Sequence, residues 1–556
     1  MNITGVQLNY IVGDFEYNYK KIRDAIIYHN TSDLIVFSEL CITGYYPYDL
    51  LNYDFVIKNQ FIIISKIKKL TKRYKTSVVV GLATPIAKTN KFYNTAYVIE
   101  DGKIIFVYHK KLIPNHSIFE EARHFLAGNE TPIFHFKGIA FSLFICEDLW
   151  FHISKQYQHS NPISVLRSNS VDVVISINAS PSMICKDISR FQISKLIVKI
   201  TSAYFFYVSQ IGGYDNIVYD GSSFALNKKS QLVKLAKKFV EDSFTFNITN
   251  SQEKLLPFNI TEDNESYVLN HITLGLKDYV KKTGFKGVVV GSSGGIDSAL
   301  TIVLATLSLG SDNVTAITMP STYSSLESVR DSINLCELLK VNLFKYDINQ
   351  EFLDAIKKFT ISFGCPPKKV TKENLQSRIR GRTLMAYANN ENLLLISTSN
   401  RSELAIGYST LYGDMCGSLN CIGDLYKEEV YKLSHFINKK YGNIIPKEII
   451  DKIPSAELSE NQKDSDDIPD YDNLDSFLRF YLDKDYLTKK EYDFSKNIVN
   501  KMSLCNKKSI LQMIHRSEFK RQQAPPVIVL RPNSLSLGRK TPITACYASA
   551  FSYKDI

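Results

Sequence analysis

The sequence predicts a two-domain α/β protein, and three observations support this prediction. The chain has 556 residues, which is more than one hydrophobic core normally organises. Both halves alternate apolar runs typical of strands with longer helical stretches, the pattern of a layered α/β domain. A polar segment near Asn247 separates the two halves. We therefore expect a first domain over residues 1–246, a linker over 247–265 and a second domain over 266–556.

The first half contains several buried strands, with a helical stretch over residues 59–74. Asp101 and Gly102 form the expected turn of a hairpin. The expected strands cover residues 33–37, 77–81, 95–99, 103–107, 139–145 and 171–177.

The second half alternates strands and helices in the manner of a doubly wound parallel sheet. Ligands of such sheets bind at the carboxyl ends of the strands. The acidic stretch over residues 461–475 is expected to be a surface loop. The expected strands cover residues 287–290, 314–318, 341–346 and 393–397.

The composition is that of an ordinary globular protein. Apolar residues make up 44% of the chain and charged residues 22%, and the net charge of +11 suits anionic ligands without demanding nucleic acid. Nine cysteines without zinc-binding spacing indicate reduced thiols and a cytoplasmic location. We expect neither a signal peptide nor a membrane span, because the amino terminus resembles a strand and the apolar runs are short.

A glycine-rich loop between a strand and a helix, residues 291–300, is the most informative feature of the second half. Backbone N–H groups and the helix dipole favour an anion there, and Asp297 places a carboxylate where Mg²⁺ can bridge to phosphate. The loop lacks the lysine of a Walker A motif and the glycine spacing of a dinucleotide fingerprint. It resembles the pyrophosphate loop of the ATP pyrophosphatases, which split ATP into AMP and pyrophosphate.

Three reactive side chains stand at the ends of predicted strands in the first half: Glu39, Lys110 and Cys146. A cysteine beside a lysine ammonium is expected to have a lowered pKa. The glutamate is suited to take the thiol proton, and the lysine is suited to stabilise the oxyanion of a tetrahedral intermediate. Taken singly, each residue has a simpler explanation, because a cysteine at a strand end is more often a packed apolar residue and Glu and Lys there are usually solvated.

The segments 38–40, 108–115 and 146–150 resemble the nitrilase-like carbon–nitrogen hydrolases in order and spacing. The resemblance implies an αββα sandwich in which Glu39, Lys110 and Cys146 act together on an amide. It selects Lys110 rather than Lys111 as the catalytic lysine. It also implies that Glu121 is an accessory carboxylate.

Residues 178–181 resemble the substrate side of glutamine-using members of that family. By this resemblance, Ser180 and Arg190 hold the amino-acid end of glutamine, and Glu147 receives its ammonium group. Tyr48 stands where an acidic residue is expected, so the match is less close at the mouth of the site.

Other polar segments accompany the glycine-rich loop in the second half. Glu403 follows a predicted strand and offers a second carboxylate for a metal. Met319 follows another strand, where an adenosine is expected. The polar residues around Arg380 either spread around a solvated helix or converge on a phosphate from an irregular loop.

Together with the segment around Lys520, these residues resemble the NAD synthetases, whose domain has an adenine nucleotide alpha hydrolase-like fold. Asp297 and Glu403 are implied as Mg²⁺ ligands. Leu411 stands where ammonia-using members tend to carry Lys, so that contact is not carried over. The implied ATP contacts are Ser293, Gly294, Gly295, Asp297, Ser298, Met319 and Thr398. The implied deamido-NAD contacts are Arg380, Asn400, Asp414 and Lys520.

Both resemblances in one chain, hydrolase first, match the layout of the glutamine-dependent NAD synthetases. Members hydrolyse glutamine to glutamate and ammonia, adenylate deamido-NAD with ATP and amidate it to NAD, with release of AMP and pyrophosphate. The resemblance implies a homo-oligomer, and a buried path for ammonia is expected between the sites. The expected small-molecule partners are glutamine, deamido-NAD and ATP.

Two alternatives remain open. In the first, the same two domains act on another adenylated acceptor, against which the segments 397–403 and around Lys520 argue. In the second, the chain is a non-catalytic nucleic-acid binder. The sequence has no basic stripe with interleaved aromatics, so we expect neither a nucleic acid nor a membrane as partner.

Overall fold

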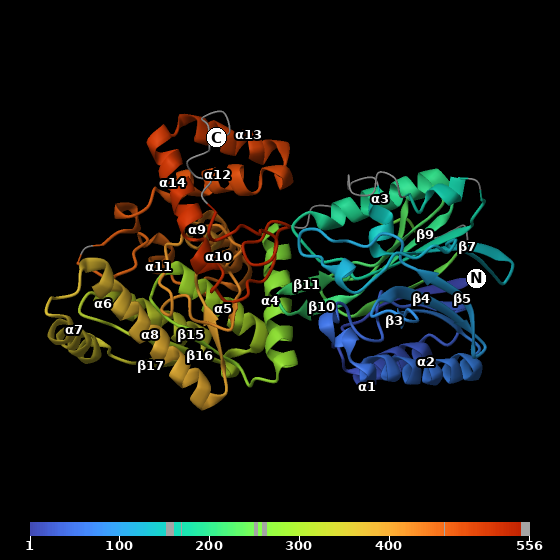
Figure 1. Cartoon of the computed structure of the whole chain (residues 1–556), viewed down its shortest axis with the longest axis horizontal. Coiled ribbons are helices and arrows are strands. Elements are labelled where there is room, and N and C mark those ends of the chain that lie inside the picture. Colours follow the sequence, from blue (N-terminus) through green and yellow to red (C-terminus); the bar gives the residue numbers. More distant parts are fainter. Residues whose placement is uncertain (152–160, 168, 250–253, 258–263, 461, 546–556) are drawn as a thin grey trace. The chain divides into compact units, whose positions relative to one another are not determined.

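The computed structural model describes residues 1–151, 161–167, 169–249, 254–257, 264–460 and 462–545 (Figure 1). The chain divides into two compact units, Met1–Gly212 with Val218–Glu262, and Gly213–Ile217 with the chain from Asp263 onward. Parts of the expected linker, residues 250–253 and 258–263, lie outside the described residues. In the described ranges, no helix combines the length and the apolar character needed to cross a bilayer.

The first unit is a sandwich of two six-stranded sheets. One sheet has the strand order β14-β1-β2-β3-β4-β5, and the other has the order β13-β12-β9-β8-β7-β6. Helices α1 and α2 run along the outer face of the first sheet and α3 along that of the second (Figure 1). The predicted αββα fold is therefore confirmed. The first sheet contains β1 (Asn2–Gln7), β2 (Leu34–Val36), β3 (Ser77–Pro85), β4 (Phe92–Glu100), β5 (Lys103–His109) and β14 (Asp242–Asn247). The second contains β6 (Ile133–Phe136), β7 (Ile139–Ile145), β8 (Val173–Asn178), β9 (Tyr204–Ser209), β12 (Phe224–Leu226) and β13 (Leu232–Leu235).

The helices of this unit are amphipathic or short. In α2, Val56, Ile63 and Ile67 recur at helical spacing and are buried, and the helix ends where Lys75 takes a left-handed conformation. The helices are α1 (Phe15–Tyr28), α2 (Asp54–Tyr74), α3 (Lys186–Thr201), η1 (Tyr48–Asn52), η2 (Glu121–Arg123), η3 (Cys146–Trp150) and η5 (Ser164–Arg167). A separate hairpin pairs β10 (Ile211–Tyr214) with β11 (Ile217–Asp220).

The candidate catalytic residues of this unit lie near the ends of strands in the two sheets. Strands β1, β2 and β3 are parallel, as are β7, β8 and β9. One buried core contains side chains of both sheets, such as Val36 and Ile175. Glu39 follows β2, Cys146 follows β7 and Asn178 ends β8. Lys110 follows β5, the edge strand of the first sheet, so the reactive residues of this unit all come shortly after the ends of strands.

The second unit contains a five-stranded parallel sheet of order β17-β16-β15-β18-β19. The order along the chain reverses between β15 and β18, which makes their carboxyl ends the switch point where ligands bind in such folds. The predicted doubly wound sheet is thus confirmed. Its strands are β15 (Val288–Gly291), β16 (Val314–Thr318), β17 (Asn342–Lys345), β18 (Leu394–Ser397) and β19 (Leu419–Asn420).

The remaining elements of the second unit are helical. The longer helices are α4 (Asn264–Thr283), α5 (Ile296–Leu309), α6 (Leu326–Leu339), α7 (Asn349–Phe363), α8 (Lys369–Glu391), α10 (Lys427–Tyr441), α12 (Tyr471–Leu482), α13 (Lys489–Lys501) and α14 (Leu504–Arg516). The shorter ones are α9 (Arg401–Ile406), α11 (Lys447–Asp451), α15 (Glu518–Arg521), η6 (Ser311–Asn313), η7 (Asp464–Asp466) and η8 (Lys484–Tyr486).

Two sequence interpretations change here. The acidic stretch was expected to be a loop to residue 475, but α12 begins at Tyr471, because Asp470 caps it and Leu474 and Phe477 bury its apolar face. Of the two alternatives for the segment around Arg380, the helix is observed, since this segment lies in α8, but it is not a solvated helix, because Gln376 and Ser377 are buried.

A buried charged cluster surrounds the ring of Tyr426. The guanidinium carbons of Arg401, Arg479 and Arg531 lie 5.2, 4.9 and 5.0 Å from the ring centroid. Acidic partners offset their charge: Arg401 donates to Asp424 at 2.6 Å. The other ion pairs of the cluster are Arg401–Asp483, Arg479–Glu428, Arg479–Glu429 and Arg531–Glu429.

Candidate active sites

In the first unit, the structure brings Glu39, Lys110 and Glu121 into one buried hydrogen-bonded group. Lys110 Nζ donates to Glu39 Oε1 at 2.8 Å and to Glu121 Oε1 and Oε2 at 2.8 and 3.0 Å. All three side chains are at most 1% exposed. The two carboxylates raise the pKa of Lys110 well above its ordinary value, although burial acts in the opposite direction. The lysine is therefore a fixed cation.

Glu39 is held in place by further donors. Asn94 Nδ2 donates to Oε1 at 2.7 Å, and the backbone N–H of Ala179 donates to Oε2 at 2.8 Å. Glu121 is held by the Tyr45 hydroxyl, which donates to Oε1 at 2.6 Å. Burial raises the pKa of Glu121 to about 7, Lys110 lowers it, and Glu39 raises it further.

Cys146 lies beside this group, and its backbone is strained. Its φ of +43° falls in the left-handed region, which is costly for a residue with a side chain and recurs at active sites. Burial, and then the Glu39 carboxylate, raise the pKa of the thiol well above its ordinary value, and Lys110 offsets only part of this. The expected lowering of the Cys146 pKa is therefore wrong for the resting site. The thiol is protonated and needs a base.

Asp148 joins the two chain segments that carry Cys146 and Lys110. Its carboxylate accepts the backbone N–H groups of Ile145, Lys111 and Leu112 at 3.0, 3.0 and 2.9 Å. It also accepts the Tyr108 hydroxyl at 2.9 Å. Sequence reasoning missed this residue, whose only signal was its place two residues after Cys146.

The residues expected to bind glutamine have different environments. Arg190 is 1% exposed and donates to Asp220 at 2.6 Å and to the carbonyls of Ser180 and Pro181, so its charge is already paired. Glu147 is 6% exposed and lies 3.2 Å from His116 Nε2.

Lys186 has a cation-π contact with the Trp150 ring, 3.9 Å from its centroid. Burial and Arg190 lower its pKa to about 8, and the charges of Glu147 and Cys146 act on it as well. Lys186 is thus a cation close to the Cys146 thiol. Arg190 cannot take its place there, because the Arg190 guanidinium is already paired.

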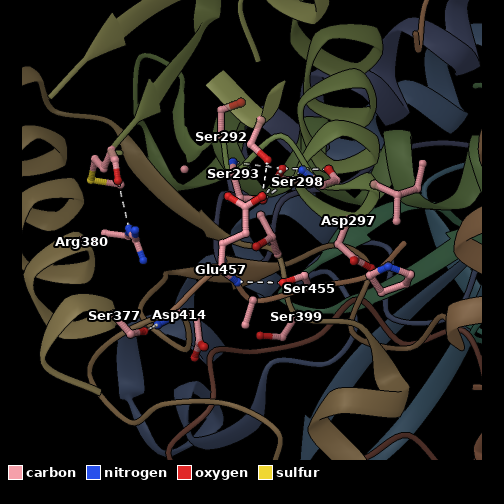
Figure 2. Close-up of a pocket in the computed structure, with 18 of the residues that line it drawn as sticks. Ser292, Ser293, Asp297, Ser298, Ser377, Arg380, Ser399, Asp414, Ser455 and Glu457 are labelled. Atoms are coloured by element: carbon pink, nitrogen blue, oxygen red, sulfur yellow. Dashed lines mark hydrogen bonds between the residues drawn. The ribbon is translucent and has the colours of Figure 1, made fainter. Parts of the chain in front are cut away.

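In the second unit, a cavity of about 280 Å³ opens at the switch point of the sheet (Figure 2). Most residues expected to bind ATP line it: Ser293, Gly295, Asp297, Ser298, Met319 and Thr398. Arg380, Glu403 and Asp414 line it as well. Among the other candidates, Gly294 lies within the glycine-rich loop. Asn400 donates to the lining residue Asp297, and Lys520 donates to the carbonyl of Gly407.

The glycine-rich loop is shaped by its own side chains. Ser293 N donates to Ser298 Oγ at 3.2 Å, and Gly295 N donates to Ser293 Oγ at 3.2 Å. Gly294 has φ +79°, and a Cβ atom there would lie 2.3 Å from the carbonyl oxygen of Ser328. Only glycine fits this position.

The carboxylates of Asp297 and Glu403 share one cation, Lys427. Lys427 Nζ lies 2.5 Å from Asp297 Oδ2 and 4.0 Å from Glu403 Oε1. Asn400 Nδ2 donates to the other oxygen of Asp297 at 3.0 Å. Burial and the nearby Asp297 raise the pKa of Glu403 well above its ordinary value, and Lys427 offsets part of this. Sequence reasoning missed Lys427, which follows no recognisable motif.

The same two carboxylates bear on the expected Mg²⁺ site. Within the described part of the chain, no group of three or more His, Cys, Asp or Glu side chains is arranged to hold a metal ion. Mg²⁺ in nucleotide sites usually takes one or two carboxylates and completes its shell with phosphate oxygens and water. Asp297 and Glu403 both line the cavity and lie close enough to share Lys427, so they offer the one or two carboxylates that such an ion uses.

The residues expected to contact deamido-NAD are held by carbonyls and amides. Arg380 Nε donates to the Met319 carbonyl at 3.1 Å, and burial lowers its pKa to about 10. Asp414 accepts Thr410 N–H at 2.7 Å, and burial raises its pKa to about 6. Lys520 Nζ donates to two carbonyls of the 407–409 turn, at 2.7 and 2.6 Å.

A second polar group in the lining of the cavity includes Glu457 (Figure 2). Glu457 accepts the hydroxyls of Ser325 and Ser328 at 2.9 and 2.6 Å. Lys452 Nζ pairs with Asp331 and lies 3.4 Å from the Gly294 carbonyl. Sequence reasoning did not single out these contacts, since they join segments more than 120 residues apart.

Comparison with known proteins gives a family match in each half of the chain. Residues 2–171 match the model of the carbon–nitrogen hydrolase family, and residues 268–524 match that of the NAD synthase family. A glutamine-dependent NAD⁺ synthetase of Synechocystis sp. is 34% identical, covering 97% of this chain and 98% of its own. One of Thermotoga maritima is 32% identical, covering 98% of both chains.

A solved structure gives the same result. The glutamine-dependent NAD⁺ synthetase of Acinetobacter baumannii in complex with ADP has a TM-score of 0.76 and 29% identity, covering 98% of both chains. Fold and sites thus define an enzyme in which an amide-hydrolase domain is joined to an ATP-using synthase domain. The chain belongs to the family of glutamine-dependent NAD⁺ synthetases.

Proposed function

We propose that this chain makes NAD⁺ from deamido-NAD, with ATP as the activating substrate and glutamine as the nitrogen donor. The observation that carries the proposal is a buried Cys-Glu-Lys site and a glycine-rich nucleotide cavity within one chain whose full-length relatives are glutamine-dependent NAD⁺ synthetases. We propose domain boundaries of residues 1–246 and 266–556, with residues 247–265 as the linker.

In the first domain, Cys146 is the nucleophile and Glu39 the base. Glu39 takes the thiol proton as the sulfur attacks the side-chain amide of glutamine, and Lys110 stabilises the oxyanion. Glu39 returns the proton to the leaving nitrogen, which departs as ammonia. Water, activated by Glu39, then hydrolyses the thioester to glutamate. The raised pKa of the Cys146 thiol supports this sequence, because a protonated thiol needs a base held as firmly as Glu39 is.

Ser180, Glu147 and Lys186 are proposed to hold the amino-acid end of glutamine. Glu147 suits the ammonium group of the substrate and Lys186 its carboxylate. Arg190 is proposed to anchor the Ser180 segment, because its guanidinium is already paired with Asp220 and with two carbonyls.

In the second domain, the carboxylate of deamido-NAD attacks the α-phosphorus of ATP, and pyrophosphate leaves onto the glycine-rich loop at Ser293, Gly294, Gly295 and Ser298. Bound Mg²⁺, held by Asp297 and Glu403, would supply charge neutralisation at the phosphates. Lys427 adds a fixed positive charge at the same place. Ammonia then attacks the acyl-adenylate to give NAD⁺ and AMP.

The remaining substrate contacts are proposed on the same basis. Met319 and Thr398 line the cavity, where we place the adenosine of ATP. Arg380 and Asp414 line the same cavity, and with Asn400 and Lys520 they are proposed to contact deamido-NAD. Asn400 and Lys520 bond to residues around the site, so their proposed roles are orientation as much as contact.

The deciding experiment compares wild type with Cys146→Ala in NAD⁺ formation from deamido-NAD and MgATP. With glutamine as nitrogen source, the variant is expected to be inactive. With ammonium, it is expected to match wild type, because Cys146 takes part only in releasing ammonia. Failure of wild type to make NAD⁺ from either nitrogen source would overturn the proposal.

The acceptor is the part of the proposal that the alternative two-domain reading challenges. Thermal shift measurements with deamido-NAD, guanine nucleotides and tRNA separate the two readings, since only a ligand of the folded state raises the melting temperature. Stabilisation by deamido-NAD alone is expected. We further propose a cytoplasmic, homo-oligomeric enzyme that binds neither nucleic acid nor membrane.

A further inference from the structure

We propose that Asp475 is a positioning residue for the ATP-using reaction, acting through Ser402 on Lys427 and Glu403. The inference rests on the proposed function, because the ATP-using reaction is itself part of that proposal. Asp475 lies on α12, outside both the glycine-rich loop and the lining of the cavity.

Asp475 is buried, at 2% exposed, and both of its oxygens have donors. Oδ1 accepts the hydroxyl of Ser402, and Oδ2 accepts the backbone N–H of Glu428 at 3.0 Å. Ser402 stands in the first turn of α9 and Glu428 in the first turn of α10. One carboxylate therefore ties together the starts of two helices.

The same hydrogen bonds continue to the two functional residues. The Ser402 hydroxyl donates its proton to Asp475, and its oxygen accepts the backbone N–H of Lys427 at 3.0 Å. Ser402 also immediately precedes Glu403 in the chain. The Ser402 hydroxyl, which Asp475 orients, therefore links the backbone of Lys427 to the chain segment that carries Glu403.

Helix α12 also supports the far end of the Lys427 side chain. Tyr471, one turn before Asp475, places its ring 5.0 Å from Lys427 Nζ. Its hydroxyl donates to Asp464 Oδ2 at 3.0 Å, which fixes the ring. Helix α12 therefore holds both the backbone and the ammonium of Lys427.

A purely structural role does not account for a carboxylate at this position. The two donors to Asp475 are a hydroxyl and an amide rather than a cation. Burial raises the pKa of Asp475 to about 6, so keeping this carboxylate ionised in the fold costs free energy. An apolar side chain of similar size fills such a place without that cost. What the apolar side chain lacks is the acceptor that orients Ser402.

The test uses the full chain with ammonium as nitrogen source, so that the Cys146 site does not limit the rate. Asp475→Leu and Ser402→Ala are each expected to lower kcat/KM for ATP by about 10- to 100-fold, the usual effect of losing an orienting partner. Asp475→Asn offers one acceptor oxygen to the two donors, Ser402 Oγ–H and Glu428 N–H, so its kcat/KM for ATP is expected to lie between those of wild type and Asp475→Leu. Partial rescue by Asp475→Asn distinguishes hydrogen-bond positioning from a need for charge, because the amide is neutral but keeps one acceptor.

Two controls separate positioning from loss of folding. Ser434→Ala removes a buried hydroxyl of α10 that bonds only to a carbonyl of its own helix, and it is expected to leave kcat/KM for ATP unchanged. Basal glutamate release from glutamine, measured without ATP, reports on the other domain, and the melting temperature of each variant reports on the domain that carries the change. The double variant Asp475→Leu with Ser402→Ala is expected to lose no more than either single variant.

The inference is overturned if Ser402→Ala and Asp475→Leu both retain wild-type kcat/KM for ATP. It is equally overturned if their losses simply multiply in the double variant, since the two residues would then act independently. If Asp475→Leu does not fold, the smaller Ser402→Ala change decides. Wild type that makes no NAD⁺ refutes the proposed function instead, so the two failures are distinguishable.

Discussion

Lys427 Nζ lies 2.5 Å from Asp297 Oδ2, although 130 residues separate the two in the chain. Asp297 stands at the start of α5, directly after β15, and Lys427 stands at the start of α10. Burial lowers the pKa of Lys427, but Asp297 and Glu403 outweigh this effect and raise it above its ordinary value. The cavity therefore carries a permanent positive charge next to the two carboxylates proposed to hold Mg²⁺.

Replacing this charge tests its part in phosphate binding. Lys427→Met keeps the length of the side chain and removes the ammonium, so we expect kcat/KM for ATP to fall by at least about 100-fold. The measurement is AMP formation with ammonium and deamido-NAD. Lys432→Met, which removes an exposed lysine of the same helix, is the matched control and should behave as wild type. Comparable losses in both variants would contradict a specific role for Lys427.

The Tyr45 hydroxyl is expected to tune the pH dependence of glutamate release. Its hydrogen bond lowers the pKa of Glu121, which burial holds at about 7, and the ionised carboxylate keeps Lys110 in place. In Tyr45→Phe the pKa of Glu121 therefore rises, and the midpoint of the rate against pH moves to higher pH. Tyr46→Phe, which removes a hydroxyl bonded to a backbone carbonyl nearby, is the control. A midpoint unchanged or shifted to lower pH would refute this assignment.

Gly294→Ala is expected to distort the glycine-rich loop. The added Cβ would lie 2.3 Å from the Ser328 carbonyl oxygen, so the loop must move, and misplacement by about 1 Å is enough to cost about 100-fold in rate. Ammonium-driven NAD⁺ formation should fall accordingly. Gly310→Ala has a similar φ of +83° but meets no atom within 4 Å, so it controls for backbone strain alone. Equal losses in the two variants would show that strain, rather than the loop's shape, is responsible.

Chelation of divalent cations is expected to separate the two half-reactions. With EDTA, NAD⁺ formation from ammonium should stop, because Asp297 and Glu403 would hold the ion that neutralises the phosphates. Basal glutamate release should continue, since the proposed thiol chemistry runs on Glu39 and Lys110. Added Mg²⁺ should restore synthesis. Full NAD⁺ synthesis in the presence of excess chelator would argue against the metal assignment.

The sequence was most informative where the signal is local. Strand 139–145 is predicted at its observed bounds, because a continuous apolar run followed by Cys146 marks a buried strand end. The glycine-rich loop is equally local, since six neighbouring residues define it. The αββα architecture and the grouping of Glu39 with Lys110 came from the family resemblance, because 71 residues separate the two.

The missed features depend on chain segments that meet only in the fold. Nothing around Lys427 indicates that its ammonium reaches Asp297, and nothing around Asp148 indicates that it accepts the N–H groups of Lys111 and Leu112. The direction of the Cys146 pKa shift was mistaken for the same reason. A neighbouring lysine is visible in a family motif, whereas complete burial of the thiol beside Glu39 is a property of the packed sandwich.

The charged cluster around Tyr426 determines where a shortened synthase domain can end. The family match stops at residue 524, but Arg531 lies beyond it and supplies two hydrogen bonds to Glu429, while Leu530 N–H serves Asp424 at 2.9 Å. A chain that ends at residue 524 would keep the buried carboxylates of Asp424 and Glu429 but lose the hydrogen bonds that Leu530 and Arg531 donate to them. Deletion libraries made to find a minimal active domain should therefore preserve the chain through Asn533, whose carbonyl accepts Arg401 at 3.0 Å.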